Sequence, residues 1–392
     1  MDIDERLLRP VQPEYGVASL GDLIPSALSA LQVPSTSDVL GLTESLSGIN
    51  KIAVLLVDGL GYHLYSQAAQ SSPILASVWG GELGGLRRLT TNFPSTTPTS
   101  LTSLGTGVTP GRHGVLGFTV NVPGTDDVLT HILWGDKPDP LLWQPVPTCF
   151  ERAAAHGVAA AIVSRIYPTG GLSAAAFRGG DPVGSDSAEE TAAGVVRSLN
   201  ASERSIVYGY YPLVDRMGHE YGVDTPQWHE AVAELDQLLR QVCRELPRDA
   251  ALLVTADHGM LNIPESAKVF IDDHPQLRHD VRVIAGEPRA RYIHVRPGKE
   301  EQVARTWRDT LGDRVEIWTR GEAITAGWFG DVSEDHRDRI GDLIVVCRGD
   351  CAIVGVTETD GPTTAALRGY HGAHSEIEMA VPLWLCRGGE VA

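Results

Sequence analysis

The chain has 392 residues and a mass of 42.1 kDa, enough for a large core and a subsidiary domain. Its 32 basic and 50 acidic side chains give a formal charge of −18, which repels nucleic-acid backbones and anionic membrane surfaces. With 42% hydrophobic and 21% charged residues, the composition is that of a soluble globular protein. We therefore expect neither a nucleic-acid polymer nor a membrane as a partner.

The N-terminal sequence and the cysteine content indicate a reducing compartment. The segment MDIDERLLRPVQPEYG lacks the basic start and apolar stretch of a secretory signal, which predicts a cytoplasmic protein. No apolar run approaches the roughly 20 residues of a membrane-spanning helix. Cys347 and Cys351 lie close in sequence, but no second pair completes a metal site of the usual spacing. We expect no disulfide framework, because the cysteines are few and scattered: Cys149, Cys243, Cys347, Cys351 and Cys386.

Short apolar runs recur along the chain and predict strands buried on both faces of a central sheet. They are Ile52–Val57, Ala159–Ser164, Ser205–Tyr211, Ala251–Thr255, Tyr292–Val295, Leu343–Cys347 and Val381–Cys386. Helix signals lie between them: Ser187 and Glu190 form a capping box before residues 192–199, and Thr225 precedes a first-turn Pro226. The alternation predicts an α/β fold with a doubly wound sheet and helices on both faces.

Two regions are irregular. Residues 107–147 are rich in Gly, Pro and Asp, and the long stretch 261–368 contains strand and helix signals of its own at 291–295 and 300–311. We therefore expect a core formed by residues 1–260 and 369–392, with 261–368 as a smaller cap or insert that also supplies some core elements.

Polar side chains follow several of the predicted strands. Asp58 comes directly after Ile52–Val57, and similar positions after the next strands hold Asp215 with His219 and Asp257 with His258. In parallel α/β sheets, ligand sites lie at the carboxyl ends of the strands. His371 and His374 come shortly before the last strand and join this set, shown by the segment GYHGAHSEIEM.

Carboxylate oxygen and neutral imidazole nitrogen form the mixed ligand set that suits Zn²⁺ and similar divalent ions. Asp215 and His219 are four residues apart, which places them on one face of a helix. Six ligands overfill a single site, so the pattern predicts two divalent ions. Zn²⁺ is the expected metal, with Mn²⁺ or another divalent ion as the alternative.

A run of hydroxyl residues, NFPSTTPTS, leads into a predicted helix that begins near Pro98. Thr97 would lie at the N-terminus of this helix, where free N–H groups favour an alkoxide or a phosphate. A metal contact would lower the pKa of the hydroxyl and make it a nucleophile. The alternative is that Ser95, Thr96, Thr97 and Thr99 only cap the helix, and spacing alone leaves the acting hydroxyl open.

The pieces VDGLG, NFPSTTPTS, DRMGHEYG, TADHGM and YHGAHSEIEM, in this order, resemble the alkaline phosphatase superfamily and its nucleotide pyrophosphatase/phosphodiesterase branch. The resemblance implies a mostly parallel central sheet sandwiched by helices, and two divalent ions, usually zinc. It assigns one ion to Asp215, His219 and His371 and the other to Asp58, Asp257 and His258. Thr97 would lie beside both ions as nucleophile and further ligand.

Two positions depart from the family pattern or compete with it. The diesterase branch usually has an Asn near position 118 that helps to hold a phosphoryl oxygen, whereas this chain has Phe118 and offers Asn121 as the nearest substitute. His371, directly before Gly372, matches the family motif better than His374 does. The sulfatase pattern, a Cys or Ser nucleophile followed by Pro-x-Arg, is absent.

The resemblance implies a metal-dependent hydrolase that cleaves phosphodiester or pyrophosphate bonds of small, nucleotide-like substrates through a phospho- or nucleotidyl-threonine. The alternatives are a phosphomonoesterase, phosphonate hydrolase or phosphomutase on the same scaffold, and a non-catalytic metal-binding protein. Two dications with three carboxylates would leave a local charge of about +1, which suits a compact phosphoryl group. Candidate substrate contacts, each equally compatible with core or surface roles, are Phe118, Tyr208, Tyr210, Tyr211, Arg112 and Arg165.

Overall fold

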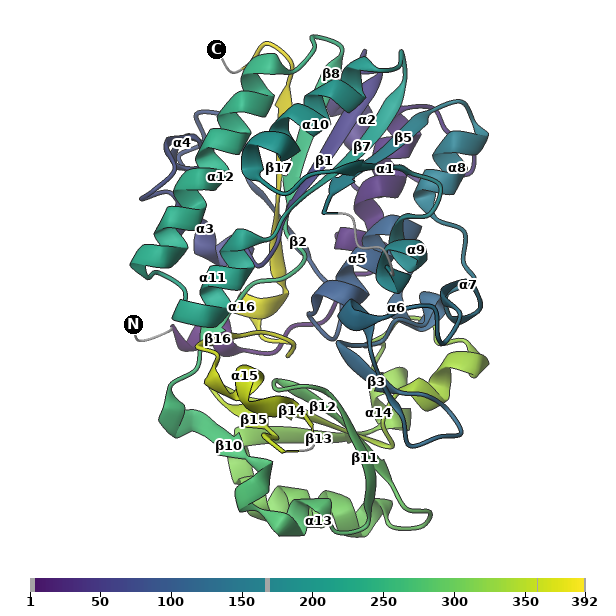
Figure 1. Ribbon diagram of the computed structural model, residues 1–392, viewed down its shortest axis with the longest axis vertical. Coiled ribbons are helices and arrows are strands. Elements are labelled where there is room, and N and C mark those ends of the chain that lie inside the picture. Colours follow the sequence, from purple (N-terminus) through teal and green to yellow (C-terminus); the bar gives the residue numbers. More distant parts are fainter. Residues whose placement is uncertain (1–3, 166–169, 358, 391–392) are drawn as a thin grey trace.

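The central sheet has seven strands in the order β2-β17-β8-β1-β7-β5-β6 (Figure 1). The computed structural model describes residues 4–165, 170–357 and 359–390. Neighbouring strands β8, β1, β7, β5 and β6 run parallel, while β17 is antiparallel to β8 and β2. This confirms the predicted mostly parallel sheet. The bounds are β1 Lys51–Val57, β2 Arg87–Thr90, β5 Ala159–Ser164, β6 Asp181–Gly184, β7 Ser205–Tyr211, β8 Ala250–Thr255 and β17 Ala380–Arg387.

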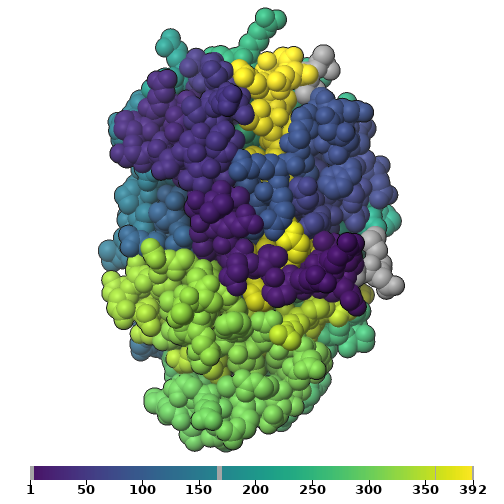
Figure 2. Space-filling view, turned by 180° about the vertical axis from the view of Figure 1, so that it is seen from behind, coloured from purple at the N-terminus to yellow at the C-terminus, as the bar shows by residue number. Residues whose placement is uncertain are grey.

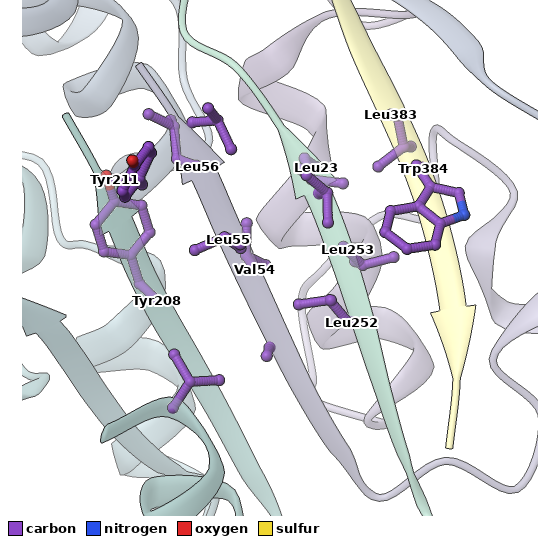
Figure 3. Close-up of a cluster of buried hydrophobic side chains, with 14 of the residues drawn as sticks. Leu23, Val54, Leu55, Leu56, Tyr208, Tyr211, Leu252, Leu253, Leu383 and Trp384 are labelled. Carbon is purple, nitrogen blue, oxygen red and sulfur yellow. The ribbon is translucent and has the colours of Figure 1, made fainter. Parts of the chain in front are cut away.

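The middle of the sheet is apolar on both faces. In β1, every residue from Ile52 to Val57 is buried, and all of β8 is buried as well. Figure 3 shows Leu55 of β1 beside Leu253 of β8, with Trp384 of β17 on the far side of β8. A strand buried on both faces has no polar alternation, which explains why its sequence is a continuous apolar run.

Helices flank the sheet in two groups (Figure 1). One group contains α10 (Ala188–Asn200), α11 (Leu213–Tyr221) and α12 (Pro226–Glu245), and the other contains α1 (Leu23–Ala30), α5 (Thr97–Thr106) and α8 (Cys149–Ala155). The predicted helix starts are confirmed: Ser187 Oγ accepts from Glu190 N, and Thr225 Oγ1 accepts from Trp228 N. The prediction of a capping box is wrong in one detail, because Glu190 Oε2 accepts from Asp186 N instead of Ser187 N.

A second, four-stranded antiparallel sheet lies below the first in Figure 1. Its order is β11-β12-β14-β13, and α13 (Glu300–Leu311) packs against it. The prediction that Tyr292–Val295 and Leu343–Cys347 belong to the central sheet is therefore wrong, because they form β12 and β14. The bounds are β11 Val281–Glu287, β12 Ala290–Val295, β13 Val315–Thr319 and β14 Leu343–Cys347.

Both faces of this second sheet are buried, which explains the error. Ile293 and Val345 pack toward α13, whereas Tyr292 and Ile344 pack toward the segment that contains Val115. Strands covered on both faces have the same apolar pattern in either sheet. The second sheet lies inside residues 261–368, and the domain boundaries stay a prediction.

The segment rich in Gly, Pro and Asp forms short elements that bridge the two sheets. It contains the hairpin β3 (Thr119–Asn121) and β4 (Val128–Thr130), the 3-10 helix η4 (His131–Leu133) and α7 (Pro140–Trp143). On the opposite face, Figure 2 shows N-terminal residues lying across the junction of the two parts, where Glu376 N donates to Arg9 O. The same segment contacts the second part as well, because Tyr15 Oη donates to Trp328 O at 2.9 Å.

The described residues contain no helix whose length and apolar character would suit a membrane span. All five cysteines are buried free thiols, and Cys347 and Cys351 pack in the apolar cluster beneath the second sheet.

Candidate active site

Three strand ends of the central sheet bring the predicted acidic residues together. Asp58 follows β1, Asp257 follows β8, and Asp215 lies in α11 directly after β7. Because β7, β1 and β8 are adjacent and parallel, their carboxyl ends lie side by side. The register continues past the strand, since Asp58 N donates to Tyr211 O at 3.0 Å.

The potential ligands form two groups of three. In the first, Asp215, His219 and His371 bring one ligand atom each within 4.8 Å of the others, and in the second Asp58, Asp257 and His258 do the same. These are the two sets that the sequence predicts. Asp215 and His219 lie on one face of α11, with Asp215 Oδ1 3.4 Å from His219 Nε2. The two groups adjoin, because the rings of His258 and His371 stack with centroids 3.5 Å apart.

Each histidine has the same hydrogen-bond arrangement. The Nδ1 atoms of His219, His258 and His371 lie 2.8, 2.9 and 2.8 Å from the carbonyl oxygens of Gly369, Gly259 and Ser95. A carbonyl only accepts, so Nδ1 carries the hydrogen and Nε2 presents its lone pair. Such second contacts orient metal-binding imidazoles. The three Nε2 atoms therefore point toward the carboxylates and could each bind a cation.

The contacts inside each group fit a cation. His219 Nε2 and His371 Nε2 lie 3.2 Å apart with a lone pair on each, an arrangement that is repulsive unless a positive charge is present. The buried atoms Asp58 Oδ1, Asp215 Oδ1 and Asp257 Oδ2 have no hydrogen-bond partner. A buried carboxylate without a partner is costly unless it is paired or binds a metal. This donor set fits two divalent ions.

The protonation of the site depends on burial. Burial, together with repulsion from Asp257 and Asp215, holds the pKa of Asp58 well above its ordinary value. Burial also raises the pKa of Asp215. Burial lowers the pKa of His371, and the nearby His258 and His219 lower it further. Burial thus disfavours the charged forms of Asp58 and Asp215, and a bound cation would favour these charged forms.

Of the hydroxyl run, Thr97 is the residue that faces the ligands. Its Oγ1 lies 3.2 Å from His258 Nε2 at the first residue of α5. Ser95 is engaged elsewhere, because its Oγ donates to Ala373 O and accepts from Gly372 N. Thr96 Oγ1 is buried without a partner. Thr99 Oγ1 is likewise buried without a partner, so Thr97 is the hydroxyl of the run that the geometry favours as nucleophile.

Gly59, in the segment VDGLG, allows the two acidic strand ends to approach. It has φ +72°, and a Cβ built on it would lie 2.9 Å from Asp215 Cα. Its N–H donates to Asp257 Oδ1 at 3.2 Å. A side chain here would push α11 away from β1, so the glycine is needed for the geometry of the site.

Tyr210 links the ligands to the neighbouring cavity, and its hydroxyl donates to Asp58 Oδ2. The sequence suggests for Tyr210 only stacking on a nucleobase or a place in the core, although the alternation of Tyr208 and Tyr210 along β7 places both on one face of the strand. This pattern is the signal that could have identified the contact.

A cavity of about 580 Å³ opens beside Thr97. We call it the Thr97 cavity. Its walls come from α5, η4, α9 (Gly171–Phe177), the start of α10 and the ends of β5 and β7, with residues of α11 and α12. Spacing in the sequence gives no sign of this wall, because its residues come from separate segments of the chain. The lining includes Leu101, Ile132, Leu133, Trp134, Leu172, Phe177, Tyr208, Tyr210 and Tyr211.

Asn121 is not available as the phosphoryl contact that the sequence suggests. Its Nδ2 donates to Thr125 O and Asp127 O, and its Oδ1 accepts from Arg282 Nη2 at 3.0 Å. The amide therefore holds the β3–β4 hairpin, so we correct this assignment. Phe118, at the expected Asn position, is partly buried.

The remaining histidines lie outside the two groups. The ring of His374 packs against Phe93 and Trp328 with centroids 5.8 and 4.9 Å away. His63 Nε2 lies 2.8 Å from Glu376 Oε1. The two histidines of the same loop thus have different surroundings, and His371 is the one among the ligands.

The two candidate arginines also differ in position. Arg112 is exposed in α6 (Pro110–His113). Arg165 lines the rim of the Thr97 cavity and pairs with Asp186 at 3.5 Å.

A family model, that of type I phosphodiesterases/nucleotide pyrophosphatases, matches residues 52–374. The chain belongs to this family. The match includes both ligand groups and Thr97, and it confirms the resemblance to the alkaline phosphatase superfamily. Members of this phosphodiesterase family can therefore be compared with the chain in sequence and fold.

The relatives are distant in sequence. A pyrophosphatase/phosphodiesterase of Schizosaccharomyces pombe, described as uncharacterised, is 21% identical over 196 residues, which is 46% of this chain and 39% of the yeast protein's length. Murine ectonucleotide pyrophosphatase/phosphodiesterase 5 matches with a TM-score of 0.67 at 18% identity, covering 85% of this chain and 87% of the murine one. Phosphonoacetate hydrolase of Sinorhizobium meliloti 1021, in complex with phosphonoformate, has a TM-score of 0.64 at 20% identity, covering 87% and 90%. These structures share the fold with the phosphodiesterase-family chain.

Proposed function

We propose that the protein hydrolyses phosphodiester or pyrophosphate bonds of small phosphoesters, with nucleotide-like compounds as the first class to test. The observation that carries this proposal is the position of Thr97 Oγ1, which lies 3.2 Å from His258 Nε2 and lines the Thr97 cavity. A hydroxyl at a helix N-terminus, beside two groups of potential metal ligands, is arranged for nucleophilic catalysis.

Asp215, His219 and His371 would hold one divalent ion, and Asp58, Asp257 and His258 the other, with Zn²⁺ as the expected metal. Bound ions would polarise the phosphoryl oxygens and lower the pKa of the attacking hydroxyl. The carbonyl groups of Gly369, Gly259 and Ser95 accept from Nδ1 of the three imidazoles and orient Nε2 of each toward the site.

Thr97 would attack phosphorus in line with the leaving oxygen. The Thr97 Oγ–P bond forms as the P–O bond to the leaving alcohol or phosphate breaks, and the hydroxyl proton passes to solvent. The N–H groups at the start of α5 favour negative charge at Thr97. Water then displaces Thr97 Oγ from phosphorus and regenerates the threonine.

What relatives bind supports this reaction class. The murine protein is known in an inactive Thr-to-Ala form in complex with AMP, and this chain has Thr97 at the start of a helix beside the potential ligands. The Sinorhizobium hydrolase binds phosphonoformate, which favours phosphonate or phosphomonoester hydrolysis as the second candidate. Phe118 and the engaged Asn121 also support it, because the chain lacks the usual diesterase amide there.

The surroundings of the site are consistent with small substrates. The formal charge of −18 disfavours polyanions, whereas a metal-loaded site would attract one phosphoryl group. A cytoplasmic location remains part of the proposal.

A parallel assay tests the proposed function. The full chain is reconstituted with Zn²⁺ or Mn²⁺ and given bis-p-nitrophenyl phosphate or p-nitrophenyl phosphate at equal concentration. We expect metal-dependent release of p-nitrophenol with the diester preferred. A preference for the monoester would favour the second candidate, and no release from either ester would favour a non-catalytic metal-binding protein.

A further inference from the structure

The Thr97 cavity has an apolar wall that runs from the nucleophile to the surface. Leu101 of α5 lies one turn after Thr97, and Trp134, Leu172 and Phe177 continue the wall away from the site. Figure 1 places α5, α9 and α7 close together on this side of the molecule. A group bound through its phosphate at Thr97 would therefore meet aliphatic and aromatic side chains next.

Three hydroxyl groups of the lining near the start of α10 have partners within the protein, whereas the Tyr208 hydroxyl, which also belongs to the lining, has none. Ser185 Oγ and Thr191 Oγ1 lie 2.6 Å apart, and Thr191 Oγ1 also donates to Ser187 O. The Ser187 hydroxyl caps α10 by accepting from Glu190 N. A nucleobase needs hydrogen-bond partners when it is buried, and these hydroxyls are occupied within the protein.

Two tyrosines of the lining are occupied in the same way. Tyr210 donates to Asp58, and Tyr211 Oη donates to Ala231 O at 2.8 Å. Their rings contribute apolar surface to the cavity while their hydroxyl groups point to protein atoms. These rings thus offer apolar contact area, and the lining also includes the charged side chains of Arg165, Asp186, Arg216 and Glu234.

The apolar wall continues outside the cavity. Ile132 and Leu133 of η4 line it and are 50% and 81% exposed. Isolated exposed leucines are common, but these two are adjacent and continuous with an apolar cavity that begins at the nucleophile. Contiguous apolar surface of this kind marks a binding region for an apolar group.

We propose that the Thr97 cavity binds a long alkyl group esterified to the substrate phosphate. Ile132 and Leu133 would contact the part of this alkyl group that extends out of the cavity. This inference rests on the proposed function and names the substrate class as phosphodiesters of an apolar alcohol. In such a substrate Thr97 Oγ bonds to phosphorus as the other alcohol leaves, and water then releases the alkyl phosphate.

A series of alkyl p-nitrophenyl phosphates tests the inference. The metal-reconstituted full chain receives the methyl, butyl and octyl esters below their aggregation concentrations, together with the thymidine 5′-ester, and kcat/KM is measured from p-nitrophenol. Full burial of a methylene corresponds to about a fourfold gain, so we expect the octyl ester to exceed the methyl ester by about tenfold or more. Equal rates along the series, or a preference for the thymidine ester, would overturn the inference and leave the proposed function standing.

A matched pair of variants tests where the alkyl group of the substrate binds. Leu133→Asp places a charge on the apolar path, and we expect it to lower the octyl-to-methyl ratio of kcat/KM severalfold. Leu142→Asp is the control, because Leu142 is 79% exposed in α7 and lies outside the lining of the cavity. An equal effect of both substitutions, or no effect of Leu133→Asp, would contradict the assigned path.

Calorimetry separates failure of this inference from failure of the proposed function. Octyl phosphate and methyl phosphate are titrated into the metal-loaded Thr97→Ala protein, and we expect octyl phosphate to bind more tightly by about tenfold or more. Tighter binding that is lost in Leu133→Asp, without turnover of any ester by the wild type, would refute the hydrolase and keep the apolar site. Equal binding of the two phosphates would refute the apolar site.

Discussion

His219 Nε2 and His371 Nε2 lie 3.2 Å apart, although both atoms have lone pairs because Nδ1 of each ring donates to a backbone carbonyl. The two residues are separated by about 150 positions in the chain, and one lies in α11 while the other follows β16 (Gly369–Tyr370). Two acceptors at this distance, beside a buried carboxylate oxygen of Asp215 without a partner, are explained by a cation that binds all three. The same two atoms therefore provide a direct test of the metal assignment.

His371→Ala removes one ligand of the first group, so we expect the variant to retain about one divalent ion per chain where the wild type retains about two. Metal content after dialysis is measured by elemental analysis. His374→Gln is the matched control from the same loop, because its ring packs against Phe93 and Trp328. Loss of an ion from His374→Gln but not from His371→Ala would reverse the assignment.

Tyr210→Phe deletes the hydroxyl that donates to Asp58 Oδ2. Loss of such an orienting contact typically weakens metal affinity or activity by about 10- to 100-fold, and we expect an effect in this range. Competition with a chromogenic chelator measures the affinity. Tyr211→Phe is the control, since its hydroxyl binds Ala231 O and its removal should cost about 1 kcal/mol of stability without changing metal affinity. Equal metal affinities for Tyr210→Phe and the wild type would exclude the orienting role.

A buried ion pair connects the second sheet to the loop that contains His371. Arg289 Nη2 lies 2.6 Å from Glu378 Oε2 with both side chains fully buried, and Glu378 Oε1 accepts from Ala373 N. Arg289→Met leaves an unpaired buried carboxylate, so we expect a loss of about 3–5 kcal/mol in the free energy of unfolding. Urea titration measures it.

The exposed pair of Arg305 and Glu301 provides the comparison for this prediction. Both side chains are mostly solvent-exposed, so Arg305→Met should cost less than about 1 kcal/mol. Similar losses for Arg289→Met and Arg305→Met would show that the buried pair contributes no more than a surface pair.

Glu287 gives the protein a pH-dependent stability. Burial raises its pKa to about 8, and the neighbouring Thr96 hydroxyl lowers this pKa only in part. The unfolded chain ionises Glu287 near its ordinary pKa of about 4.3, so the stabilising contribution of the neutral side chain is present below that pH and is lost as pH rises toward 8. We expect Glu287→Gln to gain stability relative to the wild type by roughly 3 kcal/mol at pH 7.

Unfolding free energies of the two metal-free proteins between about pH 4 and pH 8 measure this difference. Because the metal ligands titrate in both proteins, their contribution cancels in the comparison. Parallel stability profiles would contradict a raised pKa for Glu287.

The central sheet and the ligand groups could be predicted from sequence because both depend on local patterns. Asp58 and Asp257 follow apolar strands, and parallel neighbours bring such strand ends together. The second sheet was misassigned in part, since Tyr292 and Ile293 are buried on opposite faces and give the same apolar run as a central strand.

Other features of the site arise from tertiary contacts that sequence spacing does not contain. Asn121 looked available, but Arg282 and the β3–β4 hairpin occupy its amide. The carbonyl of Ser95 that orients His371 comes from a segment 276 positions away. The Thr97 cavity likewise depends on how η4 and α9 pack beside α5.

In the proposed reaction Thr97 acts as the nucleophile, and the metal site forms without it. Turnover of bis-p-nitrophenyl phosphate and divalent-ion content are therefore measured on the same preparations of wild type, Thr97→Ala and Thr97→Ser. We predict about two ions per chain in all three, a loss of several orders of magnitude in kcat for Thr97→Ala, and partial activity for Thr97→Ser, which keeps a hydroxyl. Wild-type turnover by Thr97→Ala, or by wild-type protein stripped of metal, would contradict the account.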